Sequence, residues 1–350
     1  MKITQYKAVC FAILAAMLYA ISAPVSKLLL REIPATLMAS LLYLGAGLGM
    51  FLLGFVRRRK DKERAEARLT RQELPFTIAM VVLDIAAPIF LMVGLTMTTS
   101  ATASLLNNFE IVATSLIALF IFKESISRQL WISIALITVA SAILSVEDIR
   151  NISLSFGSIF VLLACVCWGL ENNCTRKLSL KDPLEIVVIK GFGSGIGALF
   201  IALALGERTS NLPYLAMALL LGFFAYGLSI FFYIYAQREL GAARTSAYYA
   251  LAPFLGVGLS LIIFQEMPTI SFIIALVIMI IGTYFTTVEE HNHLHMHLAV
   301  THEHGHVHED GHHTHVHDQP VIGKHSHVHT HDVYTHSHKH TQDIHHVHSH

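Results

Sequence analysis

Histidine is concentrated at the end of the chain. All 23 histidines lie between positions 291 and 350, mostly at every second position. Neutral imidazole is the commonest metal-ligand side chain, and residues two apart in an extended segment point to the same side. Each run could therefore present several nitrogens to one divalent transition metal, such as zinc, nickel, cobalt or copper. The candidate ligands are His291, His293, His295, His297, His302, His304, His306, His308, His313, His315, His317, His325, His327, His329 and His331.

The same tail admits a second interpretation, as a pH-sensitive polyelectrolyte. Besides its histidines it carries six acidic and two basic side chains. Histidine titrates near about pH 6.5, so acidification would turn a weakly acidic tail strongly basic. Few apolar residues and no helical period predict a segment that is disordered without metal.

Five polar side chains inside long apolar stretches form a second group that could do chemistry: Asp84, Asn107, Glu110, Glu171 and Lys190. A charged group in a bilayer costs about 2.5–3.5 kcal/mol on insertion scales, so it is a functional candidate by default. The carboxylates of Asp84 and Glu110 could bind a proton, a cationic substrate or a metal ion. Lys190 could pair with a carboxylate or extend toward the membrane surface. The alternative for each carboxylate is a structural hydrogen bond to a neighbouring helix.

The elements that must position these side chains are membrane-spanning helices. Hydrophobic residues make up 54% of the chain and charged residues 14%, and this composition excludes a soluble globular protein. Apolar stretches long enough to cross a bilayer recur ten times. They cover residues 8–30, 34–56, 75–97, 101–122, 130–147, 157–178, 183–206, 212–236, 241–264 and 270–288. The sequence therefore predicts an all-α integral membrane protein with ten transmembrane helices.

Lysine and arginine are distributed unevenly between the loops. Loops after the even-numbered helices hold 15 of them, and loops after the odd-numbered helices hold only Arg31, Arg150 and Arg208. Because loops rich in Lys and Arg stay in the cytoplasm, both termini and the histidine tail are expected there, with the helices in the plasma membrane. The basic cluster at 57–71 could instead bind anionic lipid or nucleic acid. Control of topology accounts for it better, and we expect no nucleic-acid partner.

The two halves of the apolar region match one another in order. Matched pairs keep an offset between 138 and 149 residues: Pro34 with Pro183, Leu74–Phe76 with Leu212–Tyr214, and Phe122–Glu124 with Phe264–Glu266. Each half holds five helices, an odd number, so the second half must enter the membrane inverted. The expected division is a first repeat at 1–148, a second at 149–288 and the tail at 289–350. Inverted repeats are typical of secondary transporters, whose two bundles rock about a site near the bilayer midplane.

The second half contains one extended motif. It runs Tyr235-Ala-Gln-Arg-Glu-Leu-Gly-Ala-Ala-Arg-Thr-Ser-Ala and continues through Ala252-Pro253 to Phe264-Gln-Glu266, with a looser copy in Thr98–Glu124. Over about residues 5–288 the chain resembles the EamA-like branch of the drug/metabolite transporter superfamily. The resemblance implies a ten-helix secondary carrier, often an exporter of amino acids or other small metabolites, that works by alternating access. The chain departs from the family pattern at Ile111, where a proline is usual, and in its long histidine tail.

Three functions are consistent with these features. The first is an EamA-like carrier that exports a small metabolite and has a metal-binding, metal-responsive tail. The second is a carrier of a transition-metal ion such as Zn, Ni or Co, and the third is a metal-storing or metal-sensing membrane protein that does not transport. Residues 1–290 contain no histidine, so we place the metabolite carrier first.

The expected partners follow from the same features. The chain has no nucleotide-binding loop of the G-x-x-x-x-G-K-[ST] type, so we expect no ATP-driven transport. As a carrier, the protein is expected not to be an enzyme. We also expect no cofactor for transport, and a divalent transition metal only on the tail. The partners are then the lipid bilayer and a small-molecule or ion substrate, and a homodimer stays open.

Overall fold

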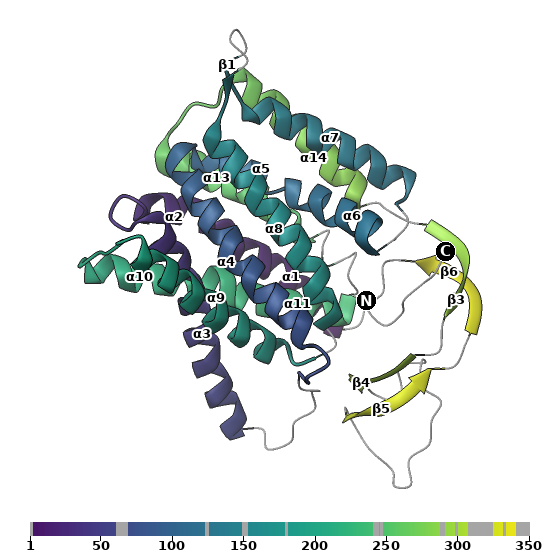
Figure 1. Cartoon of the computed structure of the whole chain (residues 1–350). Helices are drawn as coiled ribbons and strands as arrows, with labels where there is room; N and C mark the ends of the chain where they lie inside the picture. The colour runs from purple at the N-terminus through teal and green to yellow at the C-terminus, as the bar shows by residue number, and fades with distance from the viewer. Residues whose placement is uncertain are drawn as a thin grey trace.

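The structure is a computed structural model dominated by helices (Figure 1). It describes residues 3–60, 69–122, 126–148, 153–178, 181–240, 245, 248–287, 291–297, 300–306, 325–331 and 334–340. The first half contains α1 (Ile3–Ala20), α2 (Ser22–Leu29), α3 (Ala35–Lys60), α4 (Leu74–Met97), α5 (Ser100–Leu106), α6 (Phe109–Phe122) and α7 (Arg128–Ser145). The second contains α8 (Phe156–Leu178), α9 (Pro183–Ala204), α10 (Leu212–Gly222), the π-helix η1 (Phe223–Leu228), α11 (Ser229–Leu240), α13 (Ala252–Phe264) and α14 (Ile270–Thr287).

Eight helical spans of the described chain are long and apolar enough to cross a membrane. Two shorter apolar helices, Ala252–Phe264 and Ile270–Thr286, follow them. The multi-pass helical membrane architecture is therefore confirmed, and the full count of ten transmembrane helices stays a prediction. Large apolar side chains point outward, as on Phe200 and Ile262, which are 71% and 73% exposed. A lipid-facing surface explains apolar exposure on this scale, because soluble monomers rarely expose large apolar patches.

Helix α1 ends at Ala20, in the middle of the first expected span, and α2 begins at Ser22. The break follows from Pro24, which has no backbone N–H to donate to the carbonyl of Ala20 four residues earlier. We expected one continuous helix over 8–30, and the structure corrects this to two segments within one span, Tyr6–Leu29.

A second break separates α5 from α6 inside the expected span 101–122. The Asn108 side chain donates its Nδ2 to the carbonyl of Leu105 at 3.1 Å. Asparagine side chains compete in this way for the backbone groups that would otherwise continue a helix. The span 212–236 is irregular as well, because η1 interrupts it. Single-turn π segments inside α-helices occur often at functional sites.

Helices from the two halves pack in pairs. Helix α3 packs on α9, α7 on α14 and α5 on α13, while α4 packs on α8 and α1 on α11. The α3–α9 crossing depends on glycine: a Cβ atom on Gly191 would lie 2.3 Å from the Cα of Gly47. Small residues allow such close approach between membrane helices. These pairings do not test the inverted repeat, which stays a prediction.

A polar cluster lies at the end of the bundle where α4 begins. Lys181, between α8 and α9, forms an ion pair with Glu73 at 3.3 Å. Thr70 donates its backbone N–H and its hydroxyl to the same carboxylate at 2.7 and 2.6 Å. Burial raises the pKa of Glu73, but the hydrogen bonds from Thr70 and the charge of Lys181 outweigh it and hold the pKa below its usual value.

The tail differs from the expectation of disorder in four segments. Strand β3 (His291–His297) pairs antiparallel with β6 (Tyr334–His340), and β4 (Val300–His306) with β5 (His325–His331). These strands lie outside the helical bundle (Figure 1). Strict alternation of histidine with other residues has the period of a β-strand, and this accounts for the correction. His308, His313, His315 and His317 lie outside the described residues. A further short antiparallel pair, β1 (Val146–Asp148) and β2 (Ser153–Leu154), joins α7 to α8.

Candidate functional site

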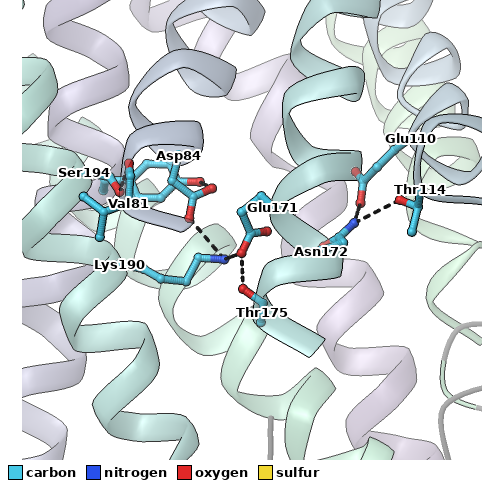
Figure 2. A network of polar contacts seen from close by, with 10 residues as sticks. Val81, Asp84, Glu110, Thr114, Glu171, Asn172, Thr175, Lys190 and Ser194 are labelled. Carbon is cyan, nitrogen blue, oxygen red and sulfur yellow. Dashed lines mark hydrogen bonds and ion pairs between the residues drawn. The ribbon is translucent and has the colours of Figure 1, made fainter. Parts of the chain in front are cut away.

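Three charged side chains from three helices meet inside the bundle. The Nζ of Lys190 on α9 lies 3.2 Å from Asp84 Oδ2 on α4 and 2.9 Å from Glu171 Oε1 on α8 (Figure 2). The contact with Glu171 is also a directed hydrogen bond, whereas the contact with Asp84 Oδ2 is an ion pair without hydrogen-bond geometry. All three side chains are buried, at 8%, 0% and 3% exposure for Lys190, Asp84 and Glu171. The lysine ammonium therefore bridges two carboxylates on different helices.

Neutral side chains complete the environment of both carboxylates. Tyr43 on α3 donates its hydroxyl to Asp84 Oδ1 at 2.9 Å. Thr175 donates its hydroxyl to Glu171 Oε1, one helical turn away on α8. Residues four apart on a helix are neighbours on its surface, so α8 itself presents this pair together. A buried charge needs such partners, since an unpaired one costs several kcal/mol.

Another polar cluster lies beside the three charged residues, on the neighbouring face of α8. Asn172 donates its Nδ2 to Glu110 Oε1 at 2.6 Å and to Thr114 Oγ1 at 3.4 Å (Figure 2). Glu110 lies in the first turn of α6, directly after the break at Asn107 and Asn108. The break thus places a carboxylate at a helix end, within the span 101–122 that we expected to be one continuous helix.

The two clusters together contain more carboxylates than cations. They hold three carboxylates, those of Asp84, Glu110 and Glu171, and one ammonium, that of Lys190, which contacts Asp84 and Glu171. The ionised network therefore carries a net charge of −2. Among the described residues no lysine or arginine forms an ion pair with Glu110. Such a network can take up protons or a positively charged group at little cost, because added positive charge relieves repulsion between the carboxylates.

The structure brings four of the five candidate residues together. Asp84, Glu171 and Lys190 are in direct contact, and Glu110 is joined to α8 through Asn172, the neighbour of Glu171. Asn107 instead lines a cavity to which none of the four charged residues contributes. Within the described part of the chain, no three His, Cys, Asp or Glu side chains are arranged to hold a metal ion.

Sequence reasoning missed the neutral partners of the network. Asn172 follows Glu171 directly, so it could have been included by proximity. Thr114 and Thr175 also stand four residues after Glu110 and Glu171, a spacing that places side chains on one helix face. Nothing in the sequence pointed to Tyr43, which comes from a different helix.

Comparison with known proteins agrees with this architecture. Residues 6–146 and 155–288 match the EamA-like transporter family. The chain belongs to this family. It is therefore a multi-pass membrane transporter, and the charged network described above lies within the matched region.

Individual relatives of the transporter are more distant. It is 28% identical over 289 residues to an uncharacterized transporter of Methanothermobacter thermautotrophicus, covering 78% of this chain and 83% of that protein. A second uncharacterized transporter, from Clostridium kluyveri, is 25% identical over 234 residues, which is 64% of this chain and 75% of that protein. One solved crystal structure has a TM-score of 0.58 at 14% identity and covers 81% of this chain and 97% of that chain. At that identity the similarity shows the fold alone.

Proposed function

We propose that this transporter exports a small metabolite by alternating access and that Lys190 is the pivot of the conformational change. The observation that carries the proposal is the position of its ammonium, which contacts Asp84 in the first half and Glu171 in the second. Because Lys190 and Glu171 both lie in the second half, relative movement of the halves must lengthen the contact between Lys190 and Asp84. A proton or a cationic group can then replace the ammonium at the carboxylate that is released.

Two further features support movement between the halves. Helix pairs at the boundary, such as α3–α9, include one member from each half, as two rocking bundles require. The irregular backbone at the α1–α2 and α5–α6 breaks lies inside membrane spans. In membrane proteins such backbone is tolerated where it is enclosed by protein or lines a cavity.

The proposal includes the topology expected from charge. The transporter would lie in the plasma membrane with ten transmembrane helices in two inverted repeats, at 1–148 and 149–288. Both termini would then lie in the cytoplasm. The uneven distribution of Lys and Arg supports this orientation. The histidine tail would then meet cytoplasmic metal.

We further propose that the tail binds a divalent transition metal and regulates transport. The backbone register of both strand pairs aligns histidine with histidine: His302 is paired with His329, and His304 with His327. Imidazole nitrogen is a preferred ligand of Zn, Ni, Co and Cu, so a metal bound by both strands of a pair would hold them together.

A transition-metal carrier is the second candidate, because the excess of carboxylates in the bundle also suits a divalent cation. Flux from proteoliposomes distinguishes the candidates. The vesicles are loaded either with a pool of amino acids and other small metabolites or with Zn²⁺, Ni²⁺ or Co²⁺ and a fluorescent metal indicator. Metabolite flux that persists in a variant lacking residues 291–350, with added metal changing only its rate, is the expected result. Metal flux abolished by Glu110→Gln would favour the metal carrier, and no flux of any kind would favour a sensor.

The pivot is tested in the same vesicles. We expect Lys190→Gln to reduce flux at least about tenfold, which corresponds to roughly 1.4 kcal/mol on the transport barrier. The milder Glu171→Gln, which leaves Lys190 paired with Asp84, should have an effect of at least this size. Lys181→Gln removes the same charge from the end of the bundle and is the matched control. Wild-type flux in Glu171→Gln and Lys190→Gln would refute the role of Lys190.

A further inference from the structure

A small cavity lies where three helix ends meet. It is bounded by the α1–α2 break, by the end of α5 and by the first turns of α13, and its volume of about 10 Å³ has room for one water-sized group. Its walls are formed by Tyr19, Ala20, Ser22, Ala23, Ser104, Asn107, Ala252, Pro253 and Gly256. The cavity therefore lies between helices of the first half and α13 of the second.

Two oxygen atoms in its wall are buried and without a hydrogen-bond partner in the described structure. They are Ser104 Oγ and Asn107 Oδ1, on residues that are 2% and 8% exposed. Buried polar atoms are nearly always satisfied, and an exception commonly marks a bound water or ion. Here both unsatisfied atoms belong to the lining of one cavity.

Further oxygens surround the same space. The Ala20 carbonyl cannot receive the usual helical hydrogen bond because Pro24 has no N–H. It faces the cavity, since a Cβ atom on Gly256 would lie 3.2 Å from this oxygen and 3.0 Å from Ser104 Oγ. Ser22 donates its hydroxyl hydrogen to Tyr226 at 3.0 Å, so its oxygen keeps lone pairs free to accept.

The charges around the cavity include both signs, with an uncompensated carboxylate nearby. Helices α1 and α5 end at its wall, where C-termini carry partial negative charge, and α2 begins there at Ser22, where an N-terminus carries partial positive charge. Glu110 follows Asn107 by three residues and forms no ion pair among the described residues. The opposing N-terminus of α13 carries Pro253 in its first turn, and this residue has no N–H to offer.

We propose that this cavity binds a small monovalent cationic group through Ser104, Asn107 and the carbonyl of Ala20. The group is either a free alkali-metal ion or the ammonium of the transported molecule, since both require a cluster of oxygen acceptors. Carbonyls freed at broken membrane helices, together with helix C-terminal ends, bind coupling cations in other secondary transporters. An occupant would join the end of α1 to the end of α5 and would fill the space against α13 of the second half. Its binding would bias the equilibrium between transport states if only one state keeps α13 in this position. This role in transport rests on the proposed carrier function, whereas the binding itself does not.

Equilibrium binding to the purified full-length protein tests the site without any transport. Thermal unfolding is followed in NaCl, KCl or methylammonium chloride, with N-methylglucamine chloride holding ionic strength constant and a chelator removing divalent metal. We expect a saturable rise of the midpoint with Na⁺, K⁺ or methylammonium, and none with the neutral analogue acetamide. A response to the alkali ions alone identifies a free coupling ion, and a response to methylammonium alone identifies the ammonium of the cargo.

Matched variants locate the site. Ser104→Ala and Asn107→Ala are each expected to weaken the apparent affinity at least about tenfold, as loss of a hydrogen bond to a charged group does. Gly256→Ala should abolish the response by filling the cavity. Ser141→Ala removes a serine oxygen that is likewise buried and unpartnered but lies elsewhere, on α7, and Gly258→Ala adds a Cβ atom with nothing within 4 Å.

Both controls should keep wild-type affinity. No saturable response to any of the three cations would overturn the proposal, because a resident water would then explain the cavity. An equal loss in the Ser141→Ala and Gly258→Ala controls, or an equal response to acetamide, would overturn it as well. Failure of the carrier function would appear separately, as absent flux in vesicles from a protein that still binds the cation.

Discussion

Removal of the Lys190 ammonium should destabilise the transporter strongly. Its contacts of 2.9 Å with Glu171 and 3.2 Å with Asp84 are each an attraction of about 5–6 kcal/mol at an effective dielectric constant of roughly 20. Desolvation of the ammonium offsets several kcal/mol of this sum. Loss of one partner from a buried ion pair typically costs about 3–5 kcal/mol. We therefore expect Lys190→Gln to lower the unfolding free energy by about that amount.

The assay is the unfolding temperature of the purified protein in detergent. At roughly 2 °C per kcal/mol for a chain of this size, the midpoint should fall by about 6–10 °C. A second substitution provides the test of cause. Lys190→Gln combined with Asp84→Asn removes one of the two carboxylates that Lys190→Gln leaves without a cation. The double variant should therefore recover part of the lost unfolding free energy, and a double-mutant cycle measures this coupling.

The result that would refute this reasoning is specific. If Lys190→Gln lowers the midpoint by less than about 2 °C, or if the double variant is no more stable than the single one, the two carboxylates do not depend on the ammonium. Lys181→Gln supplies the control, because its partner Glu73 is more exposed than Asp84 or Glu171. Ion pairs nearer the surface contribute only about 0–1 kcal/mol.

Three further predictions concern other parts of the molecule. Gly191→Ala should lower the unfolding free energy by about 1–3 kcal/mol, since its Cβ atom would lie 2.3 Å from Gly47, whereas Gly258→Ala should be neutral in the same thermal assay. Because hydrogen bonds from Thr70 and the charge of Lys181 lower the pKa of Glu73 from 4.5 in the folded state, these contacts stabilise the fold above about pH 4.5. That stability is lost as the pH falls through the lower folded value. Glu73→Gln should remove that part of the acid dependence, and an unchanged pH profile would contradict the assignment. Removal of the histidine tail should abolish zinc binding in calorimetry while leaving the unfolding temperature of the helical region within about 2 °C, because the strands lie outside the bundle.

The sequence predicted the membrane architecture well because that information is local. A stretch of apolar residues must be helical and buried in lipid wherever the rest of the chain lies, since its backbone groups have no other partners there. For the same reason, Asp84, Glu110, Glu171 and Lys190 could be selected one at a time as costly residues in apolar surroundings. The breaks near Ile21 and Asn107 were missed, because hydropathy does not report the loss of single backbone hydrogen bonds.

For the tail, in contrast, local sequence was not sufficient to predict the structure. Its composition suggested disorder, while its period-two alternation is the pattern of a strand. Whether the tail is disordered or forms strands depends on the pairing of distant segments such as β4 and β5. The sequence of one segment does not determine whether it pairs with the other.

The sequence by itself determined that this protein is a helical membrane protein with buried ionisable groups and a histidine-rich tail, because hydropathy and alternation are properties of short stretches. Only the tertiary structure decided that Lys190 bridges Asp84 and Glu171, that Tyr43 completes the network, and that Ser104 and Asn107 share one cavity. These contacts join helices that are far apart along the chain. Their distances depend on how close the helix backbones come, which glycines such as Gly47 and Gly191 permit and no single stretch of sequence specifies.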